Sequence, residues 1–475
     1  MILKKYATPQ EKEQEIQQIS QQITQELEVF FAPFLLVLER LLDKRLLRTC
    51  LEGMVAIIRF RNAKQGLLLS ELGSYMNAFI GRSETATAGT KRLGKFIGSK
   101  KWSIHHIEDY LVEQAEKEIE RLTRLKKRVL CVWDGSVIEK TESSKLEGLC
   151  PVISSKAKRL RKSRKGVVFN MPGGKPIMVT GMHWFCGLIT GMDGSVCVAF
   201  MDWWTTKGKY AIKQRDQEMK LVIKAIGKWG NMLIHVFDRG YASGLWLTFL
   251  QECEAIFVIR WIKNHIFLDQ DGKEKKVWQI GQGKKYLCHK VVTDQNGQKM
   301  NCSVWWTEVR HADYAGPLFL VKVRVEKNVW RLITNELVVT EEQAWTIFFT
   351  YRRRWKIEMS FRYGKSELAM ESPRLWSWEN RLKLLGLVTL VYSFLLFLLK
   401  PFYSDTIQLL LQLKCHRTGK RCQEALAPLY RLRWALSRLW DDAHPILGSL
   451  FPPNLETIRV LASLGRLDGF PKNQG

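Results

Sequence analysis

Two short apolar runs, each ending in an aspartate with a glycine nearby, constrain the fold of this chain more than any other feature. Residues 128–136 contain Asp134, and residues 231–241 contain Asp238. Their Val, Ile, Leu, Phe and Trp side chains favour buried β-strands, and Asp with Gly favours a turn. We therefore expect two buried strands, each presenting a carboxylate at its C-terminal end.

The segments around these runs complete a layered sheet. Residues 175–190 and 195–204 predict an antiparallel strand pair, and residues 255–262 predict a further strand. Helices are expected over residues 210–229 and 243–254, where apolar positions recur at helical spacing. Strands and helices in this order predict an α/β (α+β) fold.

A helix beginning near Thr340 carries the second informative feature. Thr340 and Gln343 have the spacing of a capping box, and no Gly or Pro follows up to residue 362. Four residues suited to phosphate and metal chemistry follow: Tyr351, Arg354, Glu358 and Lys365. At offsets of three, seven and fourteen residues from the tyrosine, they share one face of a helix that turns about 100° per residue. The simpler interpretation is an exposed basic face, where Arg354 and Glu358 form a surface ion pair worth about 0.3–0.5 kcal/mol.

The charge of the chain indicates a polyanionic partner. Its 74 Lys and Arg residues outnumber 47 Asp and Glu residues, which gives a formal net charge of +27. Neutralising phosphates and releasing counterions would make nucleic acid the favoured ligand. Residues 156–165 are the densest basic block, with seven Lys or Arg in ten residues. We expect this block to be mobile until an anion binds, and nucleic acid is favoured over a targeting receptor.

The 475-residue chain is too long for one domain of ordinary size. Residues 10–75 predict helices broken at Pro33 and Gly53, and the basic stretch that follows suits a helix-turn-helix-like unit. The resulting division has four regions: a helical N-terminal DNA-binding region (1–122), a core (123–263 and 341–400), a β-rich insertion between its parts (264–340), and a helical C-terminal region (401–475).

Other classes of protein receive little support. The ten cysteines show neither a C-x-x-C motif nor paired spacing, so no zinc site or disulfide framework is predicted. His235 and His289 lie in apolar strands and are expected to be structural. The apolar stretch 384–399 is shorter than the ~20 residues of a membrane span, so a buried helix is favoured over a membrane protein. With no signal-peptide pattern at the N-terminus, we expect a cytoplasmic, nucleoid-associated protein.

Three carboxylates are candidates for a metal site. Metal-dependent phosphate-ester cleavage uses two cations ~3.5–4 Å apart, and oxygen ligands select Mg²⁺ or Mn²⁺. Asp134, Asp238 and Glu358 would supply such ligands. Each aspartate taken alone also suits ordinary turn chemistry. The other carboxylates considered, which lack comparable placement, are Glu139, Asp193 and Asp202.

The spacing Tyr-x₂-Arg-x₃-Glu-x₆-Lys, met by Tyr351, Arg354, Glu358 and Lys365, resembles the signature of DDE transposases of the insertion-sequence-four type. The segments around Asp134 and Asp238 and the β-rich insertion are also similar to that family. The resemblance implies an RNase H-like catalytic core that binds two divalent cations through Asp134, Asp238 and Glu358. It further implies cleavage at the ends of a mobile element and joining of the ends to target DNA. Similar enzymes form hairpin ends between these two steps, and the sequence leaves open whether this chain does.

The same resemblance assigns the remaining residues. Tyr351, Arg354 and Lys365 would contact phosphates of the element end, with Arg239 as a further DNA-binding residue. A flipped base would stack on one of three tryptophans of the insertion: Trp305, Trp306 or Trp330. The implied partners are double-stranded DNA, as element ends and target, and a second copy of the chain in a homodimer on DNA. Two alternatives stay open: a catalytically inactive DNA-binding regulator and a metal-dependent nuclease without strand transfer.

Overall fold

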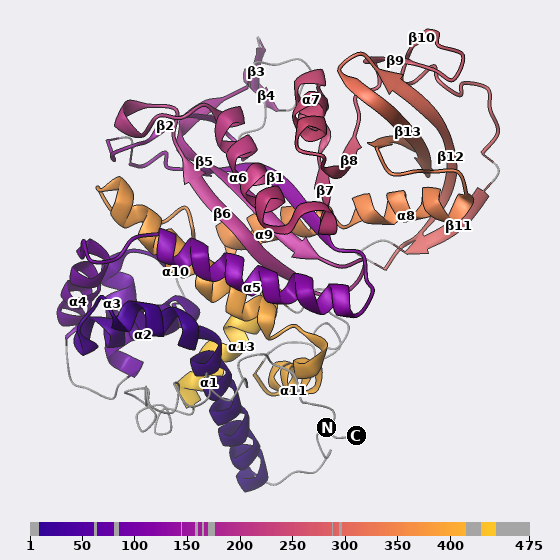
Figure 1. The fold of residues 1–475 in the computed structure, drawn as a ribbon. Helices are drawn as coiled ribbons and strands as arrows, with labels where there is room; N and C mark the ends of the chain where they lie inside the picture. The colour runs from indigo at the N-terminus through magenta and orange to yellow at the C-terminus, as the bar shows by residue number, and fades with distance from the viewer. Residues whose placement is uncertain are drawn as a thin grey trace.

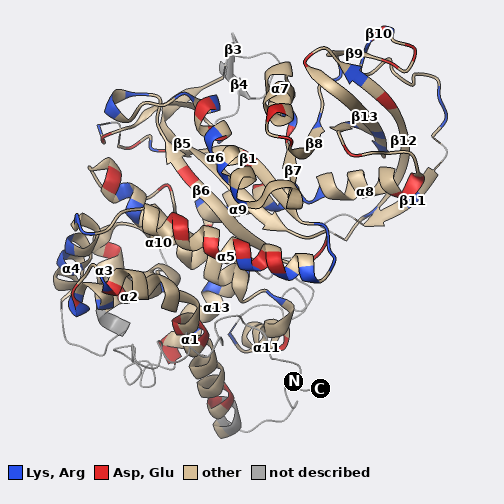
Figure 2. Ribbon diagram, viewed as in Figure 1, with Lys and Arg blue, Asp and Glu red and all other residues tan. Residues whose placement is uncertain are grey.

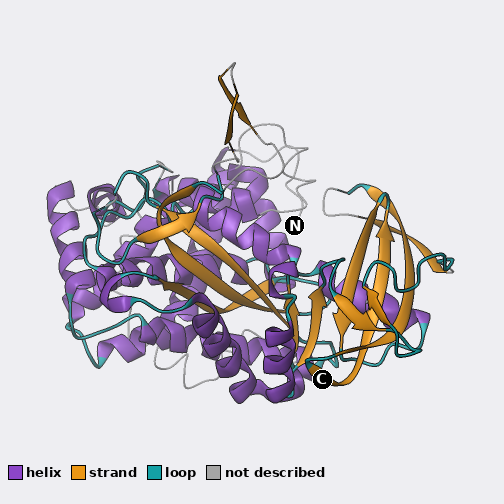
Figure 3. Ribbon diagram, turned by 90° about the horizontal axis from the view of Figure 1, so that it is seen from above, coloured by secondary structure: helices purple, strands orange, loops and turns teal. Residues whose placement is uncertain are grey.

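The structure is a computed structural model that places most of the chain around one large mixed sheet (Figure 1). The residues it describes are 9–60, 64–79, 85–143, 145–156, 160–163, 166–169, 176–286, 288–293, 297–414 and 429–442. Helices cover the sheet, and the strands of the insertion form a lobe beside the helix-rich part (Figure 3). The sequence therefore predicted the fold class correctly.

Five strands form the core of the sheet, in the order β6-β5-β1-β7-β8. β7 is parallel to both β1 and β8, whereas β5 is antiparallel to β1 and β6. This order and these directions are those of an RNase H-like core, which confirms the expected core. The strands are β1 (Leu130–Glu139), β5 (Met178–Thr190), β6 (Val196–Trp204), β7 (Ile234–Phe237) and β8 (Ile256–Arg260).

Both faces of this core are buried, which explains why its strands are almost continuously apolar. Along β1, Cys131 and Trp133 belong to one apolar cluster, and Leu130 and Val132 belong to another. The first cluster includes side chains of α5 (His105–Arg124), α6 (Gln214–Trp229) and α7 (Gly244–Glu252). The second includes those of α9 (Trp355–Ser366) and α10 (Trp378–Phe397). The alternation of side chains along each strand thus separates two packing layers.

The predicted β-rich insertion extends the core sheet instead of forming a separate one. Its last strand pairs antiparallel with β8, through Leu332 opposite Arg260. Three long antiparallel strands continue the sheet from there, and α8 (Glu341–Arg352) returns the chain to the core. The strands of the insertion are β9 (Ile266–Leu268), β10 (Glu274–Lys276), β11 (Cys288–Thr293), β12 (Lys299–His311), β13 (Tyr314–Val325) and β14 (Asn328–Thr334).

The N-terminal region is helical, as predicted, but its helices do not break where the sequence suggested. Pro33 lies inside the first helix. A proline there costs about 3 kcal/mol, and burial of Phe30, Phe31 and Phe34, at roughly 1.5–3 kcal/mol each, offsets it. Gly53 lies inside the second helix, close to Leu93. The helices before α5 are α1 (Pro9–Glu39), α2 (Lys44–Arg59), α3 (Leu69–Phe79) and α4 (Ala86–Gly98).

Basic residues are prominent on α4, which carries Lys91, Arg92 and Lys95 (Figure 2). The DNA-binding role expected for residues 1–122 stays a prediction. The C-terminal region contains α11 (Ser404–Lys414) and α13 (Leu429–Asp442). Short 3₁₀ turns in the described part of the chain are η1 (Gly208–Tyr210), η2 (Gly230–Met232), η3 (Arg239–Tyr241) and η4 (Pro401–Tyr403).

The apolar stretch near residue 390 is a core helix. α10 is the helix, among the described residues, whose length and composition would suit a membrane span, and 83% of its most apolar window is buried inside the protein. The predicted buried helix is therefore confirmed. β3 (Leu160–Ser163) lies in the basic block and pairs with β4 (Gly166–Phe169), which follows the block, and the short strand β2 (Cys150–Ile153) precedes both. The expected mobility of the block stays a prediction, and its residues 157–159 and 164–165 lie outside the described residues.

The helix beginning at Thr340 is divided, contrary to expectation. The predicted capping box is present, since the Thr340 hydroxyl accepts from the Gln343 backbone and the Gln343 side chain accepts from that of Thr340. Near residue 353, however, the backbone N–H of Arg354 donates to the carbonyl of Tyr351 at 3.0 Å. This i to i−3 bond tightens the turn and separates α8 from α9. Tyr351 and Arg354 therefore lie on either side of a helix break.

Two glycines at equivalent helical positions can test how closely α9 packs against the sheet. A Cβ at Gly364, third from the end of α9, would lie 2.7 Å from the Trp184 ring on β5. A Cβ at Gly227, third from the end of α6, would meet nothing within 4 Å. We expect Gly227→Ala to stabilise the fold by up to about 1 kcal/mol and Gly364→Ala to destabilise it. Urea unfolding of both variants measures this difference, and equal stabilisation by both would contradict the close packing of α9.

Candidate active site

Strand register brings the two aspartates together. Parallel pairing of β1 with β7 sets Trp133 opposite Phe237, so the next residues along the two strands are Asp134 and Asp238. The sequence placed Asp134 at the end of its strand, and that was wrong. β1 continues to Glu139 because β5 pairs with it along its whole length. Asp134 lies instead where the parallel partner of β1 ends.

The third carboxylate, that of Glu358, comes from α9, which packs on the Trp184 side of the sheet. Gly364 of α9 closely approaches Trp184 of β5. The Tyr392 hydroxyl of α10 also donates to Ser360 Oγ of α9 at 2.6 Å. In the β1–β5 register, Asp134 lies opposite Cys186, and residues directly opposite share a face of the sheet. Asp134 and α9 are therefore on the same side of the sheet.

The guanidinium of Arg354 lies between the three carboxylates. Its Nη1 donates to Asp134 Oδ2 at 3.2 Å, its Nη2 donates to Glu358 Oε1, and its Nε lies 4.0 Å from Asp238 Oδ1. The Arg354 residue is only 8% exposed. The sequence allowed a surface ion pair as the simpler interpretation of Arg354 and Glu358. That interpretation is wrong, because the arginine is buried and also contacts two residues from distant strands.

Tyr351 completes this group from the end of α8. Its hydroxyl donates to Asp238 Oδ1 at 3.2 Å. Burial raises the pKa of Tyr351 to about 12, against the opposing effect of Arg354. The phenol therefore stays protonated at neutral pH and acts as a hydrogen-bond donor to the carboxylate.

Ionising the Asp134 carboxyl has a high electrostatic cost. Burial raises its pKa to about 7; Arg354 lowers this pKa, whereas Asp238 and Glu358 raise it. Part of the cost of ionising Asp134 is therefore repulsion within the group. Positive charge is needed between the carboxylates, and Arg354 supplies it.

The oxygen atoms of the three carboxylates are suitable ligands for divalent cations, but the carboxylates do not lie close enough together to form a metal site. Carboxylate oxygens are the ligands that Mg²⁺ and Mn²⁺ prefer. In the described part of the chain, no three His, Cys, Asp or Glu side chains lie close enough together to hold a metal ion. Asp134, Asp238 and Glu358 surround Arg354 instead, so cations would take over the charge that the guanidinium now provides.

The structure thus brings together five of the seven predicted site residues. The other two lie at the margin: Arg239 follows Asp238 and is exposed, and Lys365 lies seven residues beyond Glu358, where its ammonium donates to Ser155 Oγ at 3.0 Å. Tyr351 and Arg354 bind carboxylates here, so their contact with phosphate stays a prediction. The catalytic and metal-binding roles of the three carboxylates also stay predictions.

Two tryptophans lie near the site, of which the sequence singled out Trp330 but not Trp355. Trp330 of β14 contacts the Tyr351 ring edge-to-face, with 5.6 Å between centroids, and Arg260 Cζ lies 5.3 Å from the centroid of the Trp330 ring. Trp355 follows Arg354 directly and is 41% exposed. Trp305 instead packs against Gly281, away from this group. A signal for Trp355 existed in the sequence, since it precedes Glu358 by three residues and so shares its side of the helix.

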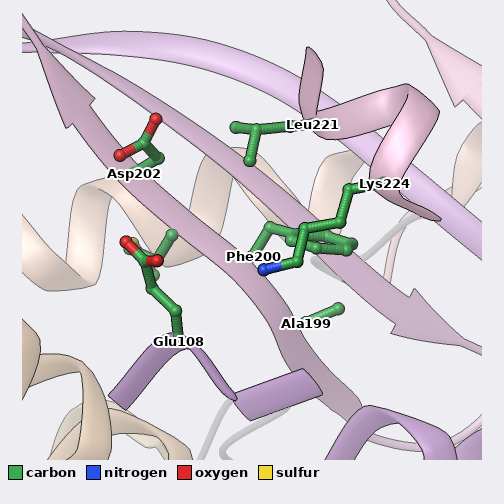
Figure 4. Close-up of a pocket in the computed structure, with 7 residues that line it drawn as sticks. Glu108, Ala199, Phe200, Asp202, Leu221 and Lys224 are labelled. Carbon is green, nitrogen blue, oxygen red and sulfur yellow. The ribbon is translucent and has the colours of Figure 1, made fainter. Parts of the chain in front are cut away.

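The other polar candidates lie elsewhere. Asp202 pairs opposite Phe185, one residue out of step with Asp134 opposite Cys186, so it occupies the other face of the sheet. There it lines a small pocket with Glu108 and Lys224 (Figure 4). His235 is buried, and its Nδ1 accepts from Trp133 Nε1 at 3.0 Å, which agrees with the predicted structural role.

The raised pKa of Asp134 predicts how its removal alters stability with pH. The folded chain keeps this proton up to about pH 7, whereas an ordinary aspartate loses it near 3.8. The free energy of unfolding therefore falls as the pH rises between these two values, because the unfolded chain releases the proton while the folded chain keeps it. We expect Asp134→Asn to raise the melting temperature relative to the unmodified chain, increasingly so from about pH 4 to about pH 7, in metal-free buffer.

Asp193→Asn is the matched control for that series. The bond from Lys127 lowers the pKa of Asp193, so its removal should lower stability above about pH 4. Thermal unfolding monitored by circular dichroism measures both variants. A gain for Asp134→Asn that did not vary with pH would contradict the burial of an ionisable carboxyl at this position.

Comparison with known proteins gives one family match and a similar solved structure. Residues 211–394 match the family model described as "Transposase DDE domain", a range that includes Asp238, Tyr351, Arg354, Glu358 and Lys365. No curated protein matches the chain. Among solved structures, a piggyBac transposase in a synaptic complex with hairpin DNA is similar at 12% identity and a TM-score of 0.39, over 91% of this chain and 78% of that chain. The family match covers residues 211–394, fewer than half of the 475 residues, so the similarity to transposase DDE domains is a property of that region.

Proposed function

We propose that the protein binds the ends of an insertion sequence and moves it by metal-dependent cleavage and strand transfer. The observation that carries this proposal is the convergence of Asp134, Asp238 and Glu358, from three separate elements, on the single guanidinium of Arg354. Such a group of carboxylates around one buried arginine has no evident structural purpose, since the carboxylates need a cation between them. Asp238 and Glu358 also lie in the region that matches a transposase DDE domain, which supports phosphate-ester chemistry.

In this proposal the three carboxylates hold two divalent cations, Mg²⁺ or Mn²⁺. When bound, the cations would activate the attacking oxygen and stabilise the leaving one. The fold of the chain positions these ligands: β1 and β7 position the two aspartates, and α9 positions the glutamate. Tyr351 orients Asp238 through its hydrogen bond.

Arg354 is proposed to have two successive partners. Before DNA and metal bind, it compensates the three carboxylates. A phosphate of the element end then offers its guanidinium a bidentate acceptor. Lys365 and Arg239 contribute further phosphate contacts, as the resemblance to the insertion-sequence-four type implies.

Trp330 is the best placed of the three tryptophans for stacking a flipped base. Its ring contacts that of Tyr351, whereas the Trp305 ring packs over Gly281. Trp306 packs against the same apolar cluster as Trp330 but has no such contact with Tyr351 among the described ring pairs. The exposed Trp355 lies on the helix of Glu358 and offers a second aromatic surface. Two such surfaces support a reaction in which a base leaves the duplex, as a hairpin intermediate requires.

The partners in this proposal are double-stranded DNA, as element ends and as target, and a second copy of the chain on the DNA. The net charge of +27 supports polyanion binding. A cytoplasmic, nucleoid-associated location follows from that substrate. The nuclease and the inactive regulator remain as alternatives that the following experiment separates.

The catalytic assignment predicts that Asp134→Asn, Asp238→Asn and Glu358→Gln each abolish Mg²⁺-dependent cutting. Each substitution removes a charged ligand and keeps the shape of the side chain, so binding to the element end should change little. The measurement uses a duplex carrying the inverted repeat that flanks the coding region, with cleavage followed on gels and binding by mobility shift. Asp193→Asn, an exposed carboxylate outside the group, should cut normally.

The products separate the alternatives. Cutting followed by joining to a plasmid target supports the transposase, cutting without joining supports the nuclease, and binding without cutting supports the regulator. Normal cutting by any one of the three variants would remove that residue from the proposed site.

The placement of Arg354 predicts a competition with divalent cations. Arg354→Ala leaves the carboxylates without their internal cation, so Mn²⁺ should raise the melting temperature of this variant more than that of the unmodified chain. The control is Arg352→Ala, since Arg352 bonds the Thr293 carbonyl instead. The same Arg354→Ala variant should bind the element end more weakly, with a flatter salt dependence. An Mn²⁺ shift no larger than that of the unmodified chain would argue against competition.

A further inference from the structure

A second polar network begins five residues beyond Asp134 on the same strand. The Glu139 side chain is buried, with the residue 7% exposed. Its carboxylate accepts four hydrogen bonds from one short segment: from Ser154 Oγ at 2.9 Å, from the Ser155 N–H at 2.7 Å, from Ser155 Oγ at 2.9 Å and from the Lys156 N–H at 3.2 Å. This carboxylate therefore fixes the segment that follows β2.

The network continues from Ser155 to α9. Ser155 Oγ accepts a hydrogen bond from Lys365 Nζ at 3.0 Å. A hydroxyl can donate to one partner and accept from another at once, so Ser155 can link Glu139 to Lys365. One bond to Ser155 uses one of the three donors of the lysine ammonium.

This link joins the same two elements that carry the catalytic candidates. Arg354 connects Asp134 of β1 to Glu358 of α9. Ser155 connects Glu139, farther along β1, to Lys365. Seven residues of α9 separate Glu358 from Lys365, which is about 10.5 Å along a helix. Two polar bridges therefore hold α9 against β1 about two turns apart.

The charges around Lys365 are mixed. Burial and Lys156 lower its pKa, whereas Glu371 and Glu139 raise it. Glu371 belongs to the same network, since its carboxylate pairs with Lys156 Nζ and accepts from the Glu139 N–H at 3.5 Å, and its carbonyl accepts from Lys140 Nζ. Lys156 is also the first residue of the basic block 156–165. The segment held by Glu139 thus starts that block beside Lys365.

We propose that Glu139 is a positioning residue: through Ser155 it holds Lys365 in place to bind a backbone phosphate of the DNA end. This inference rests on the proposed function and gives a role to a carboxylate outside the three catalytic candidates. A purely structural role for Glu139 would instead be limited to capping the segment after β2.

Double-mutant analysis of end binding distinguishes these roles. Lys365→Ala should weaken binding to the inverted-repeat duplex and reduce the slope of log K against log salt by about one. Glu139→Gln and Ser155→Ala should each reduce the slope in the same direction. Combined with Lys365→Ala, Glu139→Gln should add no further loss beyond about twofold, because both changes disable one contact. Ser155→Thr keeps the hydroxyl and should restore binding.

Glu142→Gln is the matched control, since Glu142 is an exposed carboxylate three residues farther along. It should leave both affinity and salt slope unchanged. Thermal unfolding of every variant identifies loss of fold, and Ser155→Ala, which removes one partly exposed hydroxyl, serves as the milder variant if Glu139→Gln unfolds.

Additive losses from Glu139→Gln and Lys365→Ala, or an unchanged salt slope for Glu139→Gln and Ser155→Ala, would overturn the positioning role. Those results leave the proposed function intact as long as the unmodified chain cuts the duplex and Glu358→Gln does not. If Glu358→Gln cuts normally, the proposed function fails instead, whatever the effect of Glu139.

Discussion

The contact of one guanidinium with three carboxylates is the interaction on which the site depends. Asp134, Asp238 and Glu358 come from two strands and a helix, and like charges so close together would repel and force protonation. Arg354 lies among them at 3.2 Å from Asp134 and 4.0 Å from Asp238 and bonds Glu358 directly. Burying this arginine is acceptable because its partners are anionic, and removing the arginine would leave Asp134, the least exposed of the three carboxylates, without its counter-charge. The arginine therefore keeps the elements of the site together in the absence of metal.

The break between α8 and α9 is what directs Arg354 inward. If α8 and α9 were one continuous helix, the side chains of Tyr351, Arg354 and Glu358 would follow one another along one face of it. The i to i−3 bond from Arg354 to Tyr351 tightens the backbone there, so the two helices present their side chains from either side of a turn. Tyr351 then reaches Asp238, and Arg354 reaches both strands. A short local irregularity thus converts a helical pattern into a group of residues around one point.

The sequence predicted the parts of this arrangement that depend on local pattern. Apolar runs ending at Asp134 and Asp238 identified the strands, and the capping box identified the start of α8. The sequence pattern did not predict where β1 ends, because pairing with β5 extends the strand beyond Asp134. Pro33 remains helical because aromatic packing outweighs its local cost. Contacts such as Arg354 with Asp134, 220 residues apart, depend on sheet register, which no local pattern specifies. Glu139 was set aside for the same reason, since its partners lie on a separate segment.

The two bridges between β1 and α9 have a common physical property: each uses a cationic side chain that DNA phosphates also attract. Arg354 forms one bridge and Lys365 the other, and both are held by partners inside the protein. Phosphates would compete with the carboxylates for Arg354 when a duplex binds, and this competition would leave carboxylates in need of new positive charge. Divalent cations meet that need, so DNA binding and metal binding would favour each other. Lys365 differs, because it can keep its bond to the neutral Ser155 hydroxyl while its other two ammonium donors bind phosphate. Lys365 can therefore bind phosphate at low cost, whereas Arg354 can do so only as metal replaces it.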